Sequence, residues 1–356
     1  MPPPLVLETT LRDGSYAINF QFTARDTSII AGKLEEVGFD LIEIGHGIGL
    51  GASESGHGQA CESDSSYMKA AAETLHKARW GMFCIPGIAK LEHIDLAAEY
   101  DMKFIRIGTD VSNVPISQPF IERAKEHGMF VCANYMKSYA ASPLEFAKMA
   151  SLSRQFGADI VYVVDSAGGM MPHEIEGYFS AVNDTCINCP IGFHGHDNLG
   201  LSVANALRAA ELGASIIDTS LQGMGRSAGN TPTELFLVAM QRLGRPLGHD
   251  PIKVMDIGEK YIKPMYRREG LSSLDVTTGF ALFHSSYMGV IREFSGKYGV
   301  DPRKLIIALC EKDKVEAPRG LVEELARKLS RTTDESFSAR FRLDRYHGTE
   351  QNLGKD

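Results

Sequence analysis

The sequence predicts a barrel of eight parallel strands and eight surrounding helices, a (β/α)8 or TIM barrel, followed by a helical C-terminal part. Three observations predict this fold: the length of the chain, a series of eight short apolar runs, and the amphipathic stretches between the runs. A chain of 356 residues has room for a barrel of about 250 residues and an appendage. The apolar runs cover residues 4–10, 40–45, 80–86, 103–108, 129–135, 159–165, 190–196 and 215–220.

The apolar runs have the character of parallel strands that are buried on both faces. They are short and almost continuously apolar, whereas a strand with one face in water alternates apolar and polar residues. Helical stretches such as 23–38, 142–157 and 202–213 separate them, and several end in glycine, a signal for the C-terminus of a helix. An open, doubly wound sheet would need a glycine fingerprint after the first strand, and TTLRDGS is not one. The alternation of strands and helices therefore favours the barrel.

From about residue 246 the pattern changes to helices without intervening strands. We therefore predict three parts: a barrel domain over 1–245, a helical domain over 246–330 and a polar tail over 331–356. The tail is rich in charged and polar residues, which is typical of a loosely held segment.

Composition and charge are those of an ordinary globular protein. Hydrophobic residues make up 44% of the chain and charged residues 23%, and the formal net charge of −8 argues against nucleic acid or an anionic membrane as a partner. Six cysteines are scattered, and the C-x-x-C of Cys186 and Cys189 has no second pair at zinc-site spacing, so we interpret it as structural. We expect no signal peptide and no membrane span, and therefore a cytoplasmic protein.

Polar side chains gather where the predicted strands end. Arg12 and Asp13 follow the first apolar run, Ser166 follows the sixth, and His194 and His196 lie at the end of the seventh. Active sites of barrels of this kind lie at the C-terminal ends of the strands. The sequence therefore predicts that these side chains meet at one mouth of the barrel.

The sequence His194-Gly195-His196 is the strongest local signal in the chain. Residues i and i+2 of a strand point to the same face, so the two imidazoles project together. Two imidazole nitrogens and one carboxylate make a divalent-metal site with positions left open for water or substrate. We choose Asp13 as the carboxylate, because the first strand adjoins the eighth once the barrel closes and so lies near the seventh.

Three further residues keep two interpretations each. Arg12 offers a planar guanidinium that suits a carboxylate or a developing enolate, or it is an arginine in solvent or in an internal salt bridge. Asn230 either binds the metal or caps the helix that begins at TPTELFLV, and we favour the cap. Lys137, at the end of the fifth run, either meets a second carboxylate of the substrate or is a solvated lysine.

Several motifs together resemble a known family. LETTLRDG, HGHDNLGLSVANAL and GMGRSAGNTPTELFL resemble the metallolyase barrels that include 4-hydroxy-2-oxovalerate aldolase, hydroxymethylglutaryl-CoA lyase and 2-isopropylmalate synthase. Within that group, IEIGHGIGLGAS, IVYVVDSAGGM and GFALFHSSYMGVIREFSGKYGVDPRKLIIAL are most similar to the 4-hydroxy-2-oxovalerate aldolase family. The resemblance runs from about residue 5 to about residue 330, which is nearly the whole chain.

The resemblance implies a metal-dependent aldolase that makes or uses a pyruvate enolate. It implies that Asp13, His194 and His196 bind Mn²⁺ or Mg²⁺. Arg12, Ser166 and His194 are then the residues expected to contact a small 2-oxo acid, with Arg12 steadying the enolate. The resemblance further implies that the helical part docks an acylating aldehyde dehydrogenase, and we expect a homo- or hetero-oligomer.

The sequence departs from the family pattern at both proton-transfer positions. The aldolases carry a histidine three residues after the metal-binding aspartate, where this chain has Tyr16. Their appendage contributes tyrosines in a GYAGVYSS-like stretch, where this chain has Phe280 and His284. One hypothesis is that the residue types have been exchanged, so that Tyr16 and His284 share the proton transfer.

Two other functions stay open. Arg226, in GRSAGN, resembles the condensing synthases, whose stretch reads GERAGN, and indicates a Claisen-type synthase that joins an acyl-CoA to a 2-oxo acid. Tyr16 and Phe280 instead leave room for a barrel that has lost catalysis and serves as a docking subunit. Release of free thiol from acyl-CoA would identify the synthase, and metal binding without turnover of any 2-oxo acid would identify the docking subunit.

Overall fold

Eight parallel strands close into a barrel, as the apolar runs predict. The structure is a computed structural model that describes residues 2–266 and 271–330. Each strand pairs with the next along the chain, and β8 pairs with β1 to close the sheet. The strands are β1 (Leu5–Glu8), β2 (Leu41–Glu43), β3 (Arg79–Cys84), β4 (Phe104–Asp110), β5 (Phe130–Met136), β6 (Ile160–Asp165), β7 (Ile191–Gly195) and β8 (Ile216–Thr219).

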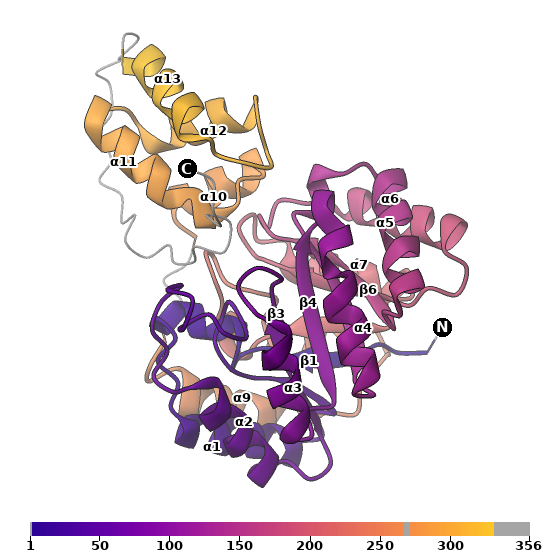
Figure 1. Ribbon diagram of the computed structural model, residues 1–356. Coiled ribbons are helices and arrows are strands. Elements are labelled where there is room, and N and C mark those ends of the chain that lie inside the picture. Colours follow the sequence, from indigo (N-terminus) through magenta and orange to yellow (C-terminus); the bar gives the residue numbers. More distant parts are fainter. Residues whose placement is uncertain (1, 267–270, 331–356) are drawn as a thin grey trace.

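Helices surround the strands on the outside of the barrel (Figure 1). Local sequence signals fix where they begin and end: the side chain of Thr23 accepts a hydrogen bond from the Asp26 amide at the start of one helix. Gly157 ends another with a φ of 109°, which a residue with a Cβ rarely adopts. The barrel helices are α1 (Ala24–Glu36), α2 (Asp64–Thr74), α3 (Leu91–Glu99), α4 (Gln118–Glu126), α5 (Pro143–Phe156), α6 (Pro172–Thr185), α7 (Ser202–Glu211) and α8 (Thr233–Arg242).

Apolar side chains fill the barrel toward the N-terminal ends of its strands. A buried cluster there contains Leu7, Leu41, Phe104 and Tyr162. Gly192 makes room for the tyrosine, because a Cβ at Gly192 would lie 2.5 Å from its ring. This packing fills the barrel beneath the C-terminal ends of the strands, where the active sites of such barrels lie.

The C-terminal helices divide between two hydrophobic cores. Val254, Ile257 and Ile262 belong to the core of the barrel, whereas the helices after residue 271 have a core of their own. The division at 245 and 246 stays a prediction, and the packing favours a boundary after Ile262; the predicted tail, 331–356, lies outside the described residues. The helices are α9 (Pro251–Ile257), a π-helical turn η5 (Gly258–Ile262), α10 (Ser273–Ala281), α11 (Met288–Tyr298), α12 (Pro302–Cys310) and α13 (Arg319–Ser330).

Short 3-10 turns lie in four strand–helix loops of the barrel and, for η6, between α10 and α11. They are η1 (Asp13–Ile18), η2 (Val111–Ser117), η3 (Ser138–Ala140), η4 (Leu221–Gly223) and η6 (Ser285–Tyr287). Across the described part of the chain, the helices are too short or too polar to traverse a bilayer.

The layer of helices α10 to α13 lies beside the mouth of the barrel (Figure 1). The amide of Asn198, in the loop after β7, donates to the hydroxyl of Thr278 over 2.8 Å. Two glycines meet nearby, because a Cβ on Gly169 would lie 2.1 Å from the carbonyl oxygen of Gly279. The barrel and the helical layer are therefore in backbone contact at this point, which only a residue without a side chain allows.

Candidate active site

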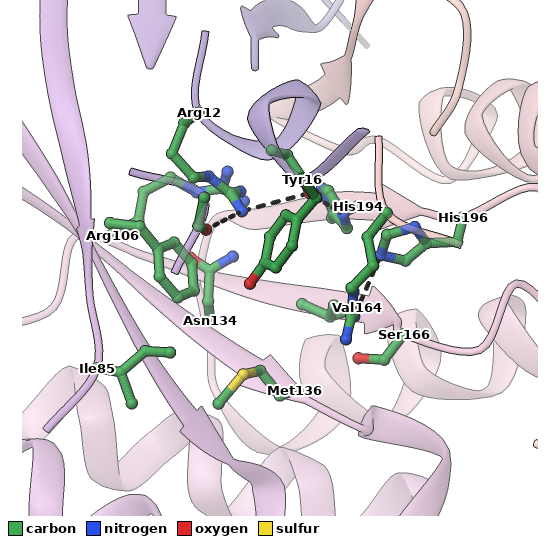
Figure 2. A pocket seen from close by; sticks show the side chains of 14 residues that line it. Arg12, Tyr16, Ile85, Arg106, Asn134, Met136, Val164, Ser166, His194 and His196 are labelled. Atoms are coloured by element: carbon green, nitrogen blue, oxygen red, sulfur yellow. Dashed lines mark hydrogen bonds and ion pairs between the residues drawn. The ribbon is translucent and has the colours of Figure 1, made fainter. Parts of the chain in front are cut away.

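The three residues predicted to bind a metal ion come together at the mouth of the barrel. Asp13 starts η1 directly after β1, and its amide donates to the Thr9 carbonyl over 2.8 Å, which turns the chain inward. His194 lies in β7 and His196 follows it, with ring centroids 5.0 Å apart. One ligand atom from each of the three lies within 4.8 Å of the other two, and all three residues are buried. Figure 2 shows both histidines projecting into one pocket.

Ion pairs fix two of these side chains. The Nε2 of His194 lies 3.2 Å from Oδ2 of Asp13, and its Nδ1 lies 2.9 Å from Oδ2 of Asp218. Burial raises the pKa of Asp13, but the charge of Arg12 and the hydrogen bond from His194 outweigh burial and hold the pKa well below its usual range. Asp13 is therefore a carboxylate, and Asp218 holds the His194 ring in one orientation, as the outer partners of metal-binding histidines do.

Two possible donor atoms of these residues have no hydrogen-bond partner among residues 2–266 and 271–330. They are Oδ1 of Asp13 and Nδ1 of His196, each fully covered by protein. Burial, supported by the positive charges of Arg226 and His194, lowers the pKa of the His196 imidazole well below its ordinary value, so the ring is neutral and offers a lone pair. Buried polar atoms are otherwise almost always hydrogen-bonded. One carboxylate and two imidazoles fit a divalent ion with open positions, and the three residues form a candidate metal site.

Arg12 forms the wall of the pocket next to the candidate metal site. Its Nε donates to Oε2 of Glu43 over 2.8 Å, and its Nη1 lies 3.3 Å from Oδ2 of Asp13. The guanidinium carbon also lies 4.6 Å from the centre of the Phe83 ring. Arg12 is thus buried in an internal salt bridge and not in solvent, and it still lines the pocket; its contact with a substrate stays a prediction.

Tyr16 and His284 lie on either side of Arg226. The guanidinium carbon of Arg226 is 5.8 Å from the centre of the Tyr16 ring, and its Nη1 is 2.9 Å from Nε2 of His284. Tyr16 lines the pocket with its hydroxyl pointing inward (Figure 2), whereas His284 contacts Arg226 and is not among the lining residues. Gly47 makes room for the tyrosine, because a Cβ there would lie 2.8 Å from its ring. Phe280, which stands where the aldolases carry the first of their two tyrosines, is 69% exposed on α10.

Ser166 lies in the pocket, but Lys137 does not. The hydroxyl of Ser166 accepts a hydrogen bond from the Lys137 amide over 2.9 Å. The Lys137 ammonium is fully buried and turns away to the helical layer, where it donates to the Tyr287 hydroxyl over 3.1 Å and to the Val315 carbonyl. Both interpretations of Lys137 were therefore wrong: it is neither solvated nor placed to meet a substrate carboxylate, and it links the barrel to the helices.

Asn230 does not cap a helix, so the favoured interpretation of this residue was wrong. Helix α8 begins at Thr233 with Pro232 at its N-cap position. The backbone of Asn230 instead bridges to His196, and both atoms of its buried side-chain amide lack a hydrogen-bond partner within the described parts of the chain. The other interpretation, a metal ligand, stays a prediction.

Sequence reasoning missed three charged residues, one that lines the pocket and two that are bonded to it. They are Glu43, Arg106 and Asp218, all with at most 2% of their surface exposed. A signal was present, because each is a charged residue inside an apolar run, as in DLIEIG, KFIRIG and SIIDTS. Charged side chains are almost never fully buried unless they are paired, so a charge in a buried strand indicates an internal ion pair.

Comparison with known proteins gives a consistent set of relatives. The model of the HMGL-like family matches residues 4–260. The chain is 34% identical to the 4-hydroxy-2-oxovalerate aldolase of Carboxydothermus hydrogenoformans, over 92% of this chain and 97% of that one. It is 36% identical to the enzyme of the same name from Pelotomaculum thermopropionicum, over 93% of this chain and 97% of that one.

Two solved structures share the fold. The carboxyl transferase domain from Rhizobium etli pyruvate carboxylase superposes with a TM-score of 0.75 at 17% identity, covering 96% of this chain and 64% of that one. The HMG-CoA lyase from Brucella melitensis gives a TM-score of 0.65 at 16% identity, covering 74% of this chain and 99% of that one. At these identities the likeness concerns the architecture alone.

Proposed function

Since the chain belongs to the HMGL-like family and, within it, to the 4-hydroxy-2-oxovalerate aldolases, carbon–carbon lyases, we propose that it cleaves 4-hydroxy-2-oxovalerate or a similar 2-oxo acid. The cleavage gives pyruvate and an aldehyde. One observation carries the proposal: the carboxylate and two imidazoles of the candidate metal site face the same pocket as the Arg12 guanidinium. This arrangement suits a substrate with adjacent oxo and carboxylate groups.

We assign the metal to Asp13, His194 and His196, with Mn²⁺ or Mg²⁺ as the ion. When bound there, a divalent ion supplies Lewis-acid polarisation of the 2-oxo group and offsets the negative charge that develops on it. The donor set and the two unpartnered ligand atoms support this assignment.

Arg12 and Ser166 are our choice for holding the substrate, with His194 beside them. Arg12 is rigid, because Glu43 and the Phe83 ring fix its guanidinium, so little reorganisation is needed when negative charge appears beside it. The other wall contains Ile85, Met136 and Val164. With Lys137 turned away from the pocket, this apolar wall fits an uncharged, short aldehyde fragment.

The proton transfers are assigned to Tyr16 and His284. In the cleavage, the proton of the 4-hydroxyl passes to a base, the C3–C4 bond breaks, and its electron pair becomes the enolate, which then takes a proton at C3 to give pyruvate. The hydroxyl of Tyr16 lies in the pocket, and burial, supported by the charge of Arg226, lowers the pKa of His284 and keeps the ring neutral. In this assignment Tyr16 exchanges the proton inside the pocket, and His284, which contacts Arg226 outside the lining, is the second proposed proton-transfer group.

Replacing Tyr16 with phenylalanine tests this assignment. We expect kcat for retro-aldol cleavage to fall about 10²-fold, the typical contribution of a general acid or base, while Mn²⁺ affinity stays unchanged. Tyr67→Phe is the matched control, because the Tyr67 hydroxyl is buried and donates to the Phe22 carbonyl, away from the pocket residues. A Tyr16→Phe enzyme with kcat within twofold of wild type would exclude Tyr16 from the proton transfer.

The experiment that tests the function itself is exchange of the methyl protons of pyruvate in D₂O, followed by NMR. Exchange that requires Mn²⁺ and stops with chelator would support an enolate-forming aldolase, even before the aldehyde is known. No exchange under either condition would favour a Claisen-type synthase, to which Arg226 also points, or a docking subunit. Thiol release from acyl-CoA in the presence of a 2-oxo acid then separates these two.

The remaining proposals concern partners and location. We propose a homo- or hetero-oligomer in the cytoplasm, in which the helical layer docks an acylating aldehyde dehydrogenase. Helix α10 supports the docking, because Phe280 and Val276, one turn apart, are 69% and 44% exposed. Large apolar side chains grouped in water are typical of an interaction surface.

A further inference from the structure

A fully buried arginine, Arg106, lies inside the barrel and lines the pocket of the candidate active site. Its Nη1 donates to Oε2 of Glu43 over 2.8 Å, and its Nη2 donates to Oδ2 of Asp218. The guanidinium carbon lies 4.8 Å above the centre of the Tyr162 ring, the aromatic floor of the barrel. Arg106 therefore holds one carboxylate from β2 and one from β8, each through one of its two terminal nitrogens.

The same two carboxylate oxygens each hold a second group that faces the pocket. Oε2 of Glu43 also accepts from Nε of Arg12, and Oδ2 of Asp218 also contacts Nδ1 of His194. Arg12 and His194 in turn meet at one oxygen, Oδ2 of Asp13, at 3.3 and 3.2 Å. The six side chains form a closed ring in the order Arg106, Glu43, Arg12, Asp13, His194, Asp218.

The ring leaves one oxygen of every carboxylate unused. Oδ1 of Asp13, Oε1 of Glu43 and Oδ1 of Asp218 are buried and have no hydrogen-bond partner in the described chain. Each carboxylate is thus held through a single oxygen that is shared by two donors. Movement of either donor changes the position of that oxygen and so the position of the other donor.

We infer that Arg106 is a positioning residue that couples the substrate-binding side of the site, Arg12, to the metal-binding side, His194. The inference rests on the proposed function. It goes beyond that function because Arg106, although it lines the pocket, makes its hydrogen bonds to Glu43 and Asp218, and we assign its role to these two bonds. An arginine is required for this, since its planar fork bonds two carboxylates at fixed angles, which a lysine ammonium cannot do.

Burial makes the coupling strong. Burial lowers the pKa of Arg106, but the charges of Asp218 and Glu43 outweigh it and raise the pKa, so the side chain is a permanent cation. In surroundings without water, the attraction between these charges is hardly screened. The ring therefore responds as one unit when any of its members is replaced.

The test uses Arg106→Lys, which keeps the charge and removes the fork. We expect the Kd of the metal-free protein for Mn²⁺, measured by electron paramagnetic resonance of the free ion, to rise about tenfold or more, as for other outer partners of metal ligands. We also expect kcat to fall about tenfold or more with a smaller change in KM. Glu8→Gln is the matched control: Glu8 is a buried carboxylate at the end of β1 whose hydrogen bonds go to Thr10, Leu221 and Thr233, outside the ring.

A second variant covers the case in which Arg106→Lys does not fold. Glu43 touches none of the three proposed metal ligands, and yet Glu43→Gln should weaken Mn²⁺ binding severalfold, because it loosens Arg12 and Arg106 together. In a double-mutant cycle with Asp218→Asn, the double variant should lose less Mn²⁺-binding free energy than the sum of the losses of the two single variants.

The outcomes separate the two proposals. Tight Mn²⁺ binding by the wild type, with Kd and kcat of Arg106→Lys within twofold of wild type, would overturn the inference and leave the proposed function standing. In the second variant, additive effects of Glu43→Gln and Asp218→Asn would also overturn it. A wild-type protein that binds no Mn²⁺ would overturn the proposed function and the inference with it.

Discussion

Replacement of His196 with alanine is expected to abolish tight Mn²⁺ binding and to lower kcat/KM for retro-aldol cleavage by about 10³-fold or more. Only Asp13 and His194 would remain as protein ligands, and these two lie 3.2 Å apart in an ion pair. Without the third ligand, this pair competes with the ion for the same lone pairs. Calorimetric titration of the metal-free protein with Mn²⁺ measures the loss directly.

The control for this variant is His249→Ala. His249 stacks on Phe39 with ring centroids 4.3 Å apart, in the barrel wall and away from the pocket residues, so its loss should leave Mn²⁺ affinity unchanged. If the affinity of His196→Ala equals that of wild type, His196 is not a ligand and the site has to be reassigned, with Asn230 as the next donor to examine.

Replacement of Arg12 with alanine should lower kcat/KM about 10²–10³-fold, mostly through kcat, if the guanidinium stabilises charge that develops during cleavage. The structure supports a direct effect, because Arg12 lines the pocket and is held by Glu43 and Phe83 before any substrate arrives. Steady-state kinetics at saturating Mn²⁺ check this prediction.

Two comparisons make the Arg12 result interpretable. Arg79→Ala, which removes an exposed arginine at the first residue of β3, should leave the kinetics unchanged. Urea unfolding measures the free energy of unfolding that Arg12→Ala costs, because Glu43 would lose one of its two arginine partners. It thereby separates a loss of stability from a loss of catalysis. An increase in KM alone, with kcat unchanged, would mean that Arg12 binds the substrate and its transition state equally.

The barrel and the grouping of Asp13, His194 and His196 could be predicted because both follow from periodicity and chain order. Buried parallel strands are continuous apolar runs, and all eight runs are strands. The placement of His194 and His196 depended on the two-residue repeat of a strand, and the choice of Asp13 depended on closure of the barrel. Each step used residues near one another in sequence or strands whose neighbours are known once the barrel closes.

The other half of the ring, Glu43, Arg106 and Asp218, could not be predicted in this way. Arg106 and Asp218 are 112 residues apart, and they meet because β4 and β8 face each other across the barrel. The sequence identifies each as a charge in an apolar run, but the partner depends on the register and tilt of strands that do not pair. Side-chain length and barrel diameter decide such contacts, and neither appears in a pattern of apolar residues.

The helical layer limited the predictions for a different reason. By the resemblance, Phe280 and His284 stand where the aldolases carry two tyrosines. The structure exposes Phe280 on α10, whereas it buries His284 beside Arg226. Leu282 lies between them with a φ of 57°, which ends α10 and redirects the chain. A left-handed leucine is uncommon, so spacing alone does not reveal that the two side chains diverge. Lys137 shows the same limitation, since its partners Tyr287 and Val315 come from the helices.

The backbone contact between Gly169 and Gly279 limits how relatives of this chain can be recombined. A chimera that joins this barrel to the helical layer of another protein would carry a foreign residue opposite Gly169, and any Cβ on Gly169 itself would overlap the Gly279 carbonyl. Even an alanine at Gly169 would push the helices away from the barrel mouth and carry His284 away from Arg226, and a Cβ on Gly279 would lie 2.9 Å from the Leu199 side chain in the loop after β7. We therefore expect that the barrel and the helical layer can be exchanged between relatives only together. A library of chimeras should place its crossovers before the first strand or after the last helix, so that both parts come from one parent.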